Sequence, residues 1–195
     1  MFKDFGKIAR LSRECIVTEK IDGTNAQVHI VSELSDQYPF DALPIAKRGE
    51  LSLFAGSRNR YLTPEDDNFG FAKWVKANAD ALWALGEGRH YGEWWGQGIQ
   101  RGYGLTEKRF SLFNVHMWSD ATVRPSCCHV VPVLARGVFD TVMLNMDLIL
   151  GRLRADGSEA APGFMNPEGI ILFHTASSTL FKKTLEGDDA PKGRR

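Results

Sequence analysis

The sequence contains a lysine flanked by two carboxylates, in the segment Glu19-Lys20-Ile21-Asp22-Gly23-Thr24-Asn25. A lysine that follows a strand and precedes a glycine-containing turn is held at a fixed place with backbone amides nearby. An amine becomes a nucleophile when it loses its proton, and neighbouring cations, including a bound metal ion, favour that loss. Lys20 is therefore a candidate nucleophile, and an exposed lysine beside a hairpin turn is the alternative.

Two further parts of the chain carry groups suited to a nucleotide. Ser57-Arg58-Asn59-Arg60 stands at a strand end, and a guanidinium matches phosphate oxygens with a planar fork. Tyr91-Gly92-Glu93-Trp94-Trp95-Gly96 sets a carboxylate among glycines and aromatic rings, where it could hold a ribose hydroxyl or a hydrated metal ion. Phe110-Ser111-Leu112-Phe113-Asn114 adds rings that can stack on a base. A solvated strand end and an aromatic sheet core are the alternatives.

The last such region is Pro167-Glu168-Gly169-Ile170-Ile171, followed by Phe181-Lys182-Lys183. A carboxylate that opens an apolar strand costs free energy unless it is paired or solvated. Glu168 is therefore a candidate ligand of a metal ion or of water. The two lysines could neutralise a phosphate, or they could form a basic surface pair.

The elements that must position these residues are short strands and two helices. Strands are expected over residues 16–18, 26–31, 51–55, 89–95, 109–118, 168–174 and 180–185, with a loop over 32–44. One helix is expected within 71–85, after an acidic start over 63–67 and before the glycines at 86 and 88. The other is expected over 142–153, with Asp140 or Thr141 as its N-cap and Gly157 as its end. We therefore predict one α+β domain over residues 1–195, built on antiparallel sheet, with a short charged tail over 186–195.

Composition narrows the class of protein without naming a function. The 195 residues carry 24 Lys and Arg against 24 Asp and Glu, so the net charge is zero and any footprint for nucleic acid must be local. Three cysteines form no disulfide framework and suit a reducing cytosol. The N-terminus resembles no signal peptide, and no apolar stretch is long enough to span a bilayer. The five histidines lack metal-ligand spacing, so we predict a cytoplasmic protein with no membrane partner and no structural zinc.

Taken in order, the motifs K-x-D-G, S-R, Y-G-E-x-x-G, F-x-x-F, E-G-I-I and F-K-K resemble the covalent nucleotidyltransferase superfamily, which contains polynucleotide ligases and mRNA capping enzymes. E-K-I-D-G-T-N and Y-G-E-W-W-G look most like the RNA ligase branch, including enzymes that seal nicks in duplex RNA. The resemblance runs from Glu19 to Lys183. It implies an ATP-grasp-like nucleotidyltransferase domain of antiparallel sheets flanked by helices.

The resemblance also implies a reaction. Lys20 attacks the α-phosphate of ATP and forms a lysyl-AMP, the AMP passes to the 5′-phosphate of a nucleic acid, and a 3′-hydroxyl then displaces AMP and seals the strand. Mg²⁺ or Mn²⁺ is the implied metal ion, and RNA is the favoured nucleic acid.

The implied roles fall on eleven residues of this sequence. They are Lys20 as nucleophile, Glu19 at the adenine edge, Ile21 in nucleotide binding, Asn25 in support of the turn, Arg58 at a phosphate, Phe113 stacked on adenine, Asp22, Glu93 and Glu168 as metal or ribose ligands, and Lys182 and Lys183 at the α-phosphate. The family has two lysines separated by one residue where these two are adjacent, so at most one faces the phosphate, and we favour Lys182.

Other departures leave alternatives open. Asn114 stands where an acidic residue is common, and about a dozen residues follow Lys183, so no OB-fold or other C-terminal domain is evident. We expect a stripped domain, a fragment, or reliance on an accessory protein, with Arg58, Arg60 and Arg101 as candidate contacts to the nucleic acid. The alternatives are a minimal ATP-dependent DNA ligase and an adenylate-binding or nucleic-acid-binding module without sealing activity; a capping guanylyltransferase fits less well.

Overall fold

The computed structural model describes residues 12–187, which divide into two compact units. The lysine unit, named for Lys20, contains residues 12–21 and 132–187, and the central unit contains residues 22–131. Composition indicates no boundary after residue 21 or after residue 131, where the chain passes from one unit to the other. The single nucleotidyltransferase domain over 1–195 remains a prediction. Most of the predicted charged tail over 186–195 lies outside the described residues.

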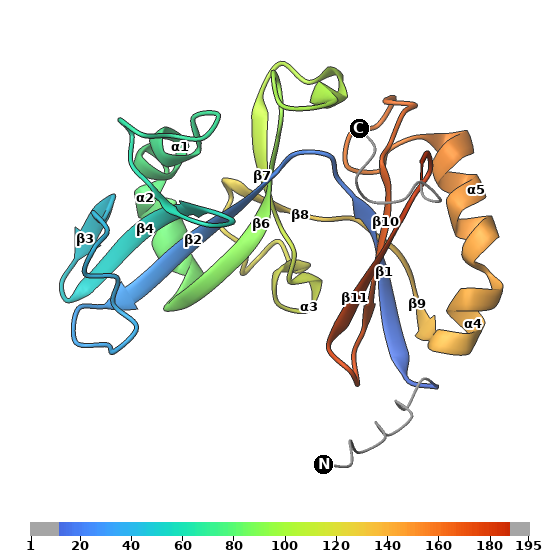
Figure 1. The fold of residues 1–195 in the computed structure, drawn as a ribbon, viewed down its shortest axis with the longest axis horizontal. Helices are drawn as coiled ribbons and strands as arrows, with labels where there is room; N and C mark the ends of the chain where they lie inside the picture. Colours follow the sequence, from blue (N-terminus) through green and yellow to red (C-terminus); the bar gives the residue numbers. More distant parts are fainter. Residues whose placement is uncertain (1–11, 188–195) are drawn as a thin grey trace, which may run out of the picture. The chain divides into compact units, whose positions relative to one another are not determined.

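The lysine unit is an antiparallel sheet covered by two helices on one face (Figure 1). The strand order is β11-β10-β1-β9, and the strands are β1 (Glu14–Lys20), β9 (Val133–Val138), β10 (Gly169–His174) and β11 (Thr179–Thr184). The helices are α4 (Phe139–Leu144) and α5 (Met146–Asp156). Their apolar side chains pack on alternate residues of β1 and β10, which makes one face of the sheet a hydrophobic core.

Alternation along β1 decides which face each functional residue occupies. Cys15 and Val17 belong to the core beneath the helices, so Glu19 begins on that same face. Lys20 follows Glu19 directly and therefore lies on the opposite face, at the last position of the strand. The dipeptide Glu19-Lys20 thus sends one charged side chain into the unit and the other away from it.

The central unit is a larger sheet with the strand order β3-β4-β2-β6-β7-β8, in which β5 also pairs with β4 (Figure 1). The strands are β2 (Thr24–Ser32), β3 (Ala46–Arg48), β4 (Leu51–Ser57), β5 (Tyr61–Leu62), β6 (Gly88–Gly96), β7 (Lys108–Leu112) and β8 (Cys128–Val130). One face packs against α1 (Phe71–Ala77), α2 (Ala79–Leu82) and the 3-10 turn η1 (Trp83–Leu85). The remaining elements are the short α3 (Val115–Trp118) and the 3-10 turn η2 (Gly102–Gly104).

The α+β class and the antiparallel sheets are confirmed, with one exception: β8 runs parallel to β7. The strands β3, β5, β8 and β9 were not predicted, and the strand predicted over 109–118 is wrong beyond Leu112, because Val115–Trp118 forms the helix α3 capped by Asn114. No helix within residues 12–187 is long and apolar enough to cross a membrane.

Both predicted helices are wrong in detail, because each is interrupted at an asparagine. Asn78 separates α1 from α2 and Asn145 separates α4 from α5, and both have non-helical backbone angles. Each asparagine side chain donates a 2.8 Å hydrogen bond to the carbonyl four residues earlier, which competes with continuation of the helix.

The predicted helix starts are also displaced. The N-cap of α4 is Val138, not Asp140 or Thr141. The acidic segment 63–67 precedes α1 without belonging to it, and Asp67 accepts hydrogen bonds from the backbone N–H groups of Ala72 and Lys73 in the first turn. Gly157 does end α5, as expected.

Candidate functional site

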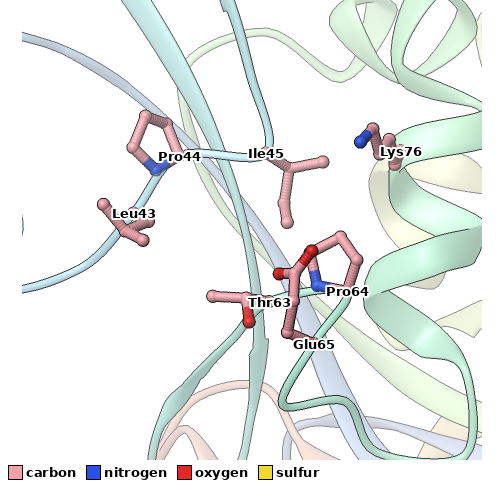
Figure 2. Close-up of a pocket in the computed structure, with 7 residues that line it drawn as sticks. All are labelled: Leu43, Pro44, Ile45, Thr63, Pro64, Glu65 and Lys76. Carbon is pink, nitrogen blue, oxygen red and sulfur yellow. The ribbon is translucent and has the colours of Figure 1, made fainter.

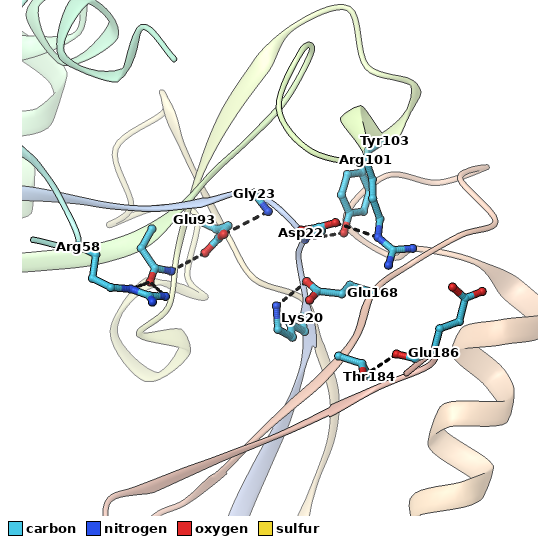
Figure 3. A network of polar contacts seen from close by, with 11 residues as sticks. Lys20, Asp22, Gly23, Arg58, Glu93, Arg101, Tyr103, Glu168, Thr184 and Glu186 are labelled. Atoms are coloured by element: carbon cyan, nitrogen blue, oxygen red, sulfur yellow. Dashed lines mark hydrogen bonds and ion pairs between the residues drawn. The ribbon is translucent and has the colours of Figure 1, made fainter. Parts of the chain in front are cut away.

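The amine of Lys20 lies beside a carboxylate from the neighbouring strand of the lysine unit. Lys20 is the register partner of Gly169, which opens β10, so the preceding residue Glu168 is brought next to it. Lys20 Nζ donates to Glu168 Oε2 at 2.5 Å (Figure 3), and the side chains are 23% and 16% exposed. The sheet therefore joins two of the predicted residues, 148 positions apart in the chain, into one partly buried ion pair.

The glycine after Glu168 is required by close packing of the strands. A Cβ on Gly169 would lie 2.2 Å from the carbonyl oxygen of Lys183 and 2.7 Å from the Cα of Thr184, which no real side chain tolerates. The E-G-I-I motif thus keeps the edge strand β11 close to the position where Glu168 meets Lys20.

Glu19 is buried on the helix-covered face, with only 1% of its surface exposed. Its Oε1 accepts a hydrogen bond from Ser158 Oγ at 2.6 Å, and its Oε2 accepts one from the Ala160 N–H at 2.9 Å. Burial raises the pKa of this carboxyl, while the bonds from Ser158 and Ala160 act in the opposite direction. The carboxylate is thus fixed by the loop after α5, and its contact with an adenine edge remains a prediction.

Sheet register separates the two adjacent lysines of β11. Lys182 pairs with Ile171, which pairs with Thr18, so Lys182 shares the face of Thr18 and Lys20. Lys183 pairs with Ile170, which is buried in the core beneath the helices. Lys182 is consequently the lysine on the face of the nucleophile candidate.

Within the central unit, the turn that follows Lys20 is held by a glycine-rich loop. Arg101 Nε donates to Asp22 Oδ2 at 2.9 Å, and the backbone N–H of Asp22 donates to the hydroxyl of Tyr103 at 2.8 Å (Figure 3). Tyr103 is itself buried against the ring of Trp95. Arg101, expected at a nucleic-acid phosphate, is thus engaged with a carboxylate of the motif.

A second chain of hydrogen bonds links Glu93 to Arg58. Glu93 Oε1 accepts from the Gly23 N–H at 3.2 Å and Oε2 accepts from Asn25 Nδ2 at 2.9 Å. The other end of the amide, Asn25 Oδ1, accepts from Arg58 Nε at 2.9 Å and Nη2 at 2.5 Å (Figure 3). A Cβ on Gly23 would lie 2.5 Å from the carbonyl oxygen of Trp94, which explains the glycine of K-x-D-G.

Phe113 and Asn114 directly follow β7, which lies between β6 and β8 in the same sheet. The Phe113 side chain is 42% exposed, so its ring is accessible to a partner. Asn114 is the N-cap of α3, and its Oδ1 accepts from the Met117 N–H at 3.1 Å. The cap uses only the side-chain oxygen, which an aspartate would supply equally well, so it does not explain an amide at this position.

The chemistry of the donors suits a hard divalent cation, although no ready-made cage is present. Asp22, Glu93 and Glu168 offer oxygen ligands of the kind Mg²⁺ and Mn²⁺ prefer, but each already accepts from a protein donor. Among residues 12–187, no group of three or more His, Cys, Asp or Glu side chains is arranged to hold a metal ion. Because Mg²⁺ is commonly bound through one or two carboxylates together with phosphates and water, the carboxylate oxygens of each unit, taken by themselves, fit a metal that arrives with a nucleotide.

A separate pocket of about 190 Å³ lies in the central unit (Figure 2). It is lined by Leu43, Pro44, Ile45, Thr63, Pro64, Glu65 and Lys76. None of the predicted site residues lines it, so it does not mark the candidate chemistry.

Sequence reasoning missed two residues that hold the predicted ones. Tyr103 sits in the glycine-rich segment 96–104, a composition that signals a tight functional loop. Ser158 follows the helix stop at Gly157, but nothing local indicates that its partner is Glu19, because the two are 139 residues apart.

The folded units and their charged clusters define a mixed α+β protein with a paired lysine at a strand end. The model of the RNA ligase family matches residues 13–184, and this chain therefore belongs to the RNA ligase family.

Similar solved structures include variants and complexes of Naegleria gruberi RNA ligase. A point variant with ATP and Mn has 19% identity and a TM-score of 0.57 over 89% of this chain and 49% of that one. A second variant with ATP and Mn has 17% identity and a TM-score of 0.59 over 91% and 51%. The complex with pyrophosphate has 19% identity and a TM-score of 0.56 over 89% and 50%. This chain thus spans about half the length of those ligases, and no curated protein matches it.

Proposed function

We propose that this chain is the adenylyltransferase part of an ATP-dependent RNA ligase, which forms a lysyl-AMP on Lys20, transfers the AMP to a 5′-phosphate and seals that end to a 3′-hydroxyl. The observation that carries the proposal is the ion pair between Lys20 Nζ and Glu168 Oε2 at 2.5 Å. Membership of the RNA ligase family supports the reaction class. The Naegleria ligase structures with ATP, AMP and Mn support the choice of nucleotide and metal ion.

The first step is a displacement at phosphorus. Lys20 Nζ attacks the α-phosphorus of ATP, the N–P bond forms, and the bond from that phosphorus to the oxygen bridging to the β-phosphate breaks. Pyrophosphate leaves with the electron pair, and the nitrogen gives up a proton. Glu168 is placed to accept that proton, because its carboxylate lies within hydrogen-bond distance of Nζ.

The remaining residues bind and orient the nucleotide, which is the main task in phosphoryl transfer. Lys182, on the face of Lys20, is assigned to the α-phosphate, and Arg58 to a phosphate. Glu19 and Ile21 are assigned to the adenosine, with Phe113 stacking on the base.

The carboxylates are assigned to the metal and the ribose. Oxygen ligands for Mg²⁺ or Mn²⁺ are Glu168 in the lysine unit and Asp22 and Glu93 in the central unit. When bound, the metal ion neutralises phosphate charge in the transition state. Asn25 holds Glu93 and Arg58 in place through its two amide ends.

RNA with 5′-phosphate and 3′-hydroxyl ends is the proposed partner, in accordance with the family. The accessory protein expected from the sequence remains a prediction. This chain spans about half the length of the similar ligases. We therefore propose the sealing step for the ligase as a whole and not for this segment alone.

The proposal is tested by offering the protein ATP or GTP labelled at the α-phosphate, with Mg²⁺ or Mn²⁺. A phosphoramidate is stable to alkali and released by acid or hydroxylamine, so the expected label from ATP is covalent and hydroxylamine-labile. No covalent label from either nucleotide would overturn the proposal, and preferential label from GTP would redirect it to guanylyl transfer. Sealing of a nick with ribose or deoxyribose at the 3′-hydroxyl side then decides between RNA and DNA.

A further inference from the structure

Two arginines on one face of the central sheet are held by amides instead of carboxylates. This face is the side opposite the core under α1 and α2, and β2 contributes Asn25 and Gln27 to it at alternate positions. Asn25 Oδ1 accepts from Arg58, as described above. Gln27 Oε1 accepts from Arg89 Nη1 at 3.1 Å, while its Nε2 donates to the Ser57 carbonyl at 3.0 Å.

The charge of Arg89 is therefore positioned without being neutralised. Within residues 12–187, Arg89 is in no ion pair, whereas Arg60 and Arg101 each contact an aspartate. Its guanidinium carbon lies 5.7 Å from the centre of the Tyr61 ring, which orients the group further. Arg89 is exposed and uses one of its five N–H donors on Gln27, so further donors remain for a ligand.

Burial and the charge of Arg89 lower the pKa of the neighbouring His29. His29 lies beside Arg89 in the register of β2 and β6 and is almost fully buried. Its pKa is lowered to about 4, first by burial and then by the positive charges of Arg89 and His90. His29 is thus neutral at physiological pH and adds no competing charge to the face.

Exposed aromatic rings lie next to Arg89. Tyr91 follows it by two residues on the same face of β6 and is 54% exposed. The Tyr91 carbonyl accepts a hydrogen bond from the Phe113 N–H at 3.0 Å, so the two partly exposed aromatic residues are neighbours across the sheet. A fixed cation beside exposed rings is the combination that binds single nucleic-acid strands, through phosphate contacts and base stacking.

We propose that Arg89 and Tyr91 form a binding site for a strand of the RNA substrate, in which Arg89 contacts a phosphate of the backbone and Tyr91 stacks on a base. The site is distinct from the residues assigned to ATP, and Gln27 is its positioning residue. The inference rests on the proposed function, since it takes RNA as the ligand.

The test measures RNA binding without the chemistry. A fluorescein-labelled single-stranded RNA is titrated with the full chain in EDTA, without ATP, and anisotropy is followed over a series of salt concentrations. The variants are Arg89→Ala, Arg89→Lys, Tyr91→Ala and Tyr91→Phe. Arg48→Ala is the matched control, because Arg48 is an exposed arginine of the same sheet that stacks on Trp83 but has Asp80 as a partner. Labelling with ATP and Mg²⁺ is measured separately for every variant.

For Arg89→Ala we expect weaker binding and a salt slope, in log affinity against log salt, reduced by about 0.7, the value for one phosphate of a single strand. Arg89→Lys should keep the slope, because it keeps the charge. Tyr91→Ala should weaken binding about tenfold without changing the slope, and Tyr91→Phe should bind like the wild type. Covalent labelling should be unchanged in all of them.

Equal losses for Arg48→Ala and Arg89→Ala would overturn the proposal, since any surface arginine would then serve. Unchanged binding in both Arg89→Ala and Tyr91→Ala would overturn it as well. Failure of the wild type to label with ATP, with RNA binding intact and dependent on Arg89, would instead count against the proposed ligase function and leave the binding site in place.

Discussion

One cation of the lysine unit, Lys20, is held by a carboxylate, whereas two cations of the central unit, Arg58 and Arg89, are held by amides. In the lysine unit, Lys20 Nζ donates a hydrogen bond to the carboxylate of Glu168 at 2.5 Å. In the central unit, Arg58 and Arg89 are held by the neutral amide oxygens of Asn25 and Gln27. A lysine can lose its proton, and Glu168 lies close enough to accept it during the reaction, whereas an arginine stays charged and attracts phosphate best when no carboxylate neutralises it.

The largest effect is expected from breaking the ion pair between Lys20 and Glu168. Glu168→Gln keeps the size of the side chain but removes the base and its charge. We expect the rate of covalent AMP formation to fall at least about a hundredfold, or ~2.7 kcal/mol in activation free energy. Rapid-quench labelling measures the rate, and Glu14→Gln, at the exposed start of β1, the strand that ends at Lys20, is the control. A normal rate with unchanged Mg²⁺ dependence would remove Glu168 from the reaction.

A second prediction concerns the buried neighbour of Lys20. Ser158→Ala deletes a hydrogen bond to the Glu19 carboxylate and should lower the free energy of unfolding by about 2 kcal/mol near neutral pH. Because that bond opposes the rise in the pKa of Glu19, its loss raises this pKa further. Glu19 in the folded variant then keeps its proton to a higher pH than Glu19 in the folded wild type. The variant therefore loses stability relative to the wild type as the pH rises through the pKa of Glu19 in the two folded proteins.

Urea unfolding at about pH 4 and about pH 8 measures this difference. The deficit should be smaller at the acidic pH, where Glu19 is protonated more fully in both proteins. A deficit that is the same at both values would show that Ser158 acts independently of the Glu19 charge, through packing and the hydrogen bond that its Oγ accepts from the Ala161 N–H.

A third prediction uses the two adjacent lysines as their own control. Lys182→Ala should slow AMP transfer to Lys20 about tenfold through loss of a phosphate contact, whereas Lys183→Ala should change it less than about twofold. The reason is that Lys182 shares the face of Lys20 and Lys183 faces the side of the helices. The reverse order of effects would refute the assignment made from the sheet register.

The smallest effect is expected from charging the neutral amide of Gln27 that holds Arg89. Gln27→Glu should convert the hold on Arg89 into an ion pair and weaken RNA binding about threefold, with a shallower salt dependence. Gln97→Glu, which adds the same charge at an exposed position of the same unit, should have a smaller effect. Equal weakening by both substitutions would show that net charge alone matters.

The site residues named from the sequence remain predictions, whereas the elements expected to carry them can be compared with the structure and were placed only in part. The motif glycines could be recognised from their residue type and spacing. The structure adds the reason for Gly23 and Gly169, which is the close approach of backbone atoms from other strands. The ion pair of Lys20 with Glu168 joins two of the residues named from the sequence. The helices were overextended because apolar spacing continues through Asn78 and Asn145, while the side-chain bonds that break the helices do not show in that spacing.

What the sequence could not supply were partners distant along the chain. Ser158 contacts Glu19, Tyr103 contacts the Asp22 turn, and Gln27 contacts Arg89, each across a large sequence separation. Strand register decides such contacts, and single-residue spacing does not reveal it. The choice of Lys182 over Lys183 shows the same point, since it became a geometric statement only once β11 was placed against β10.

Mapping the modified residue shows whether Lys20 carries the AMP. Wild-type protein is incubated with ATP and Mg²⁺, digested at neutral pH and analysed by tandem mass spectrometry, beside Lys20→Ala with its fold verified by circular dichroism. We expect a single AMP on the peptide containing Lys20 and none on the variant. AMP on Lys182, on Lys183 or on the Lys20→Ala protein would contradict it.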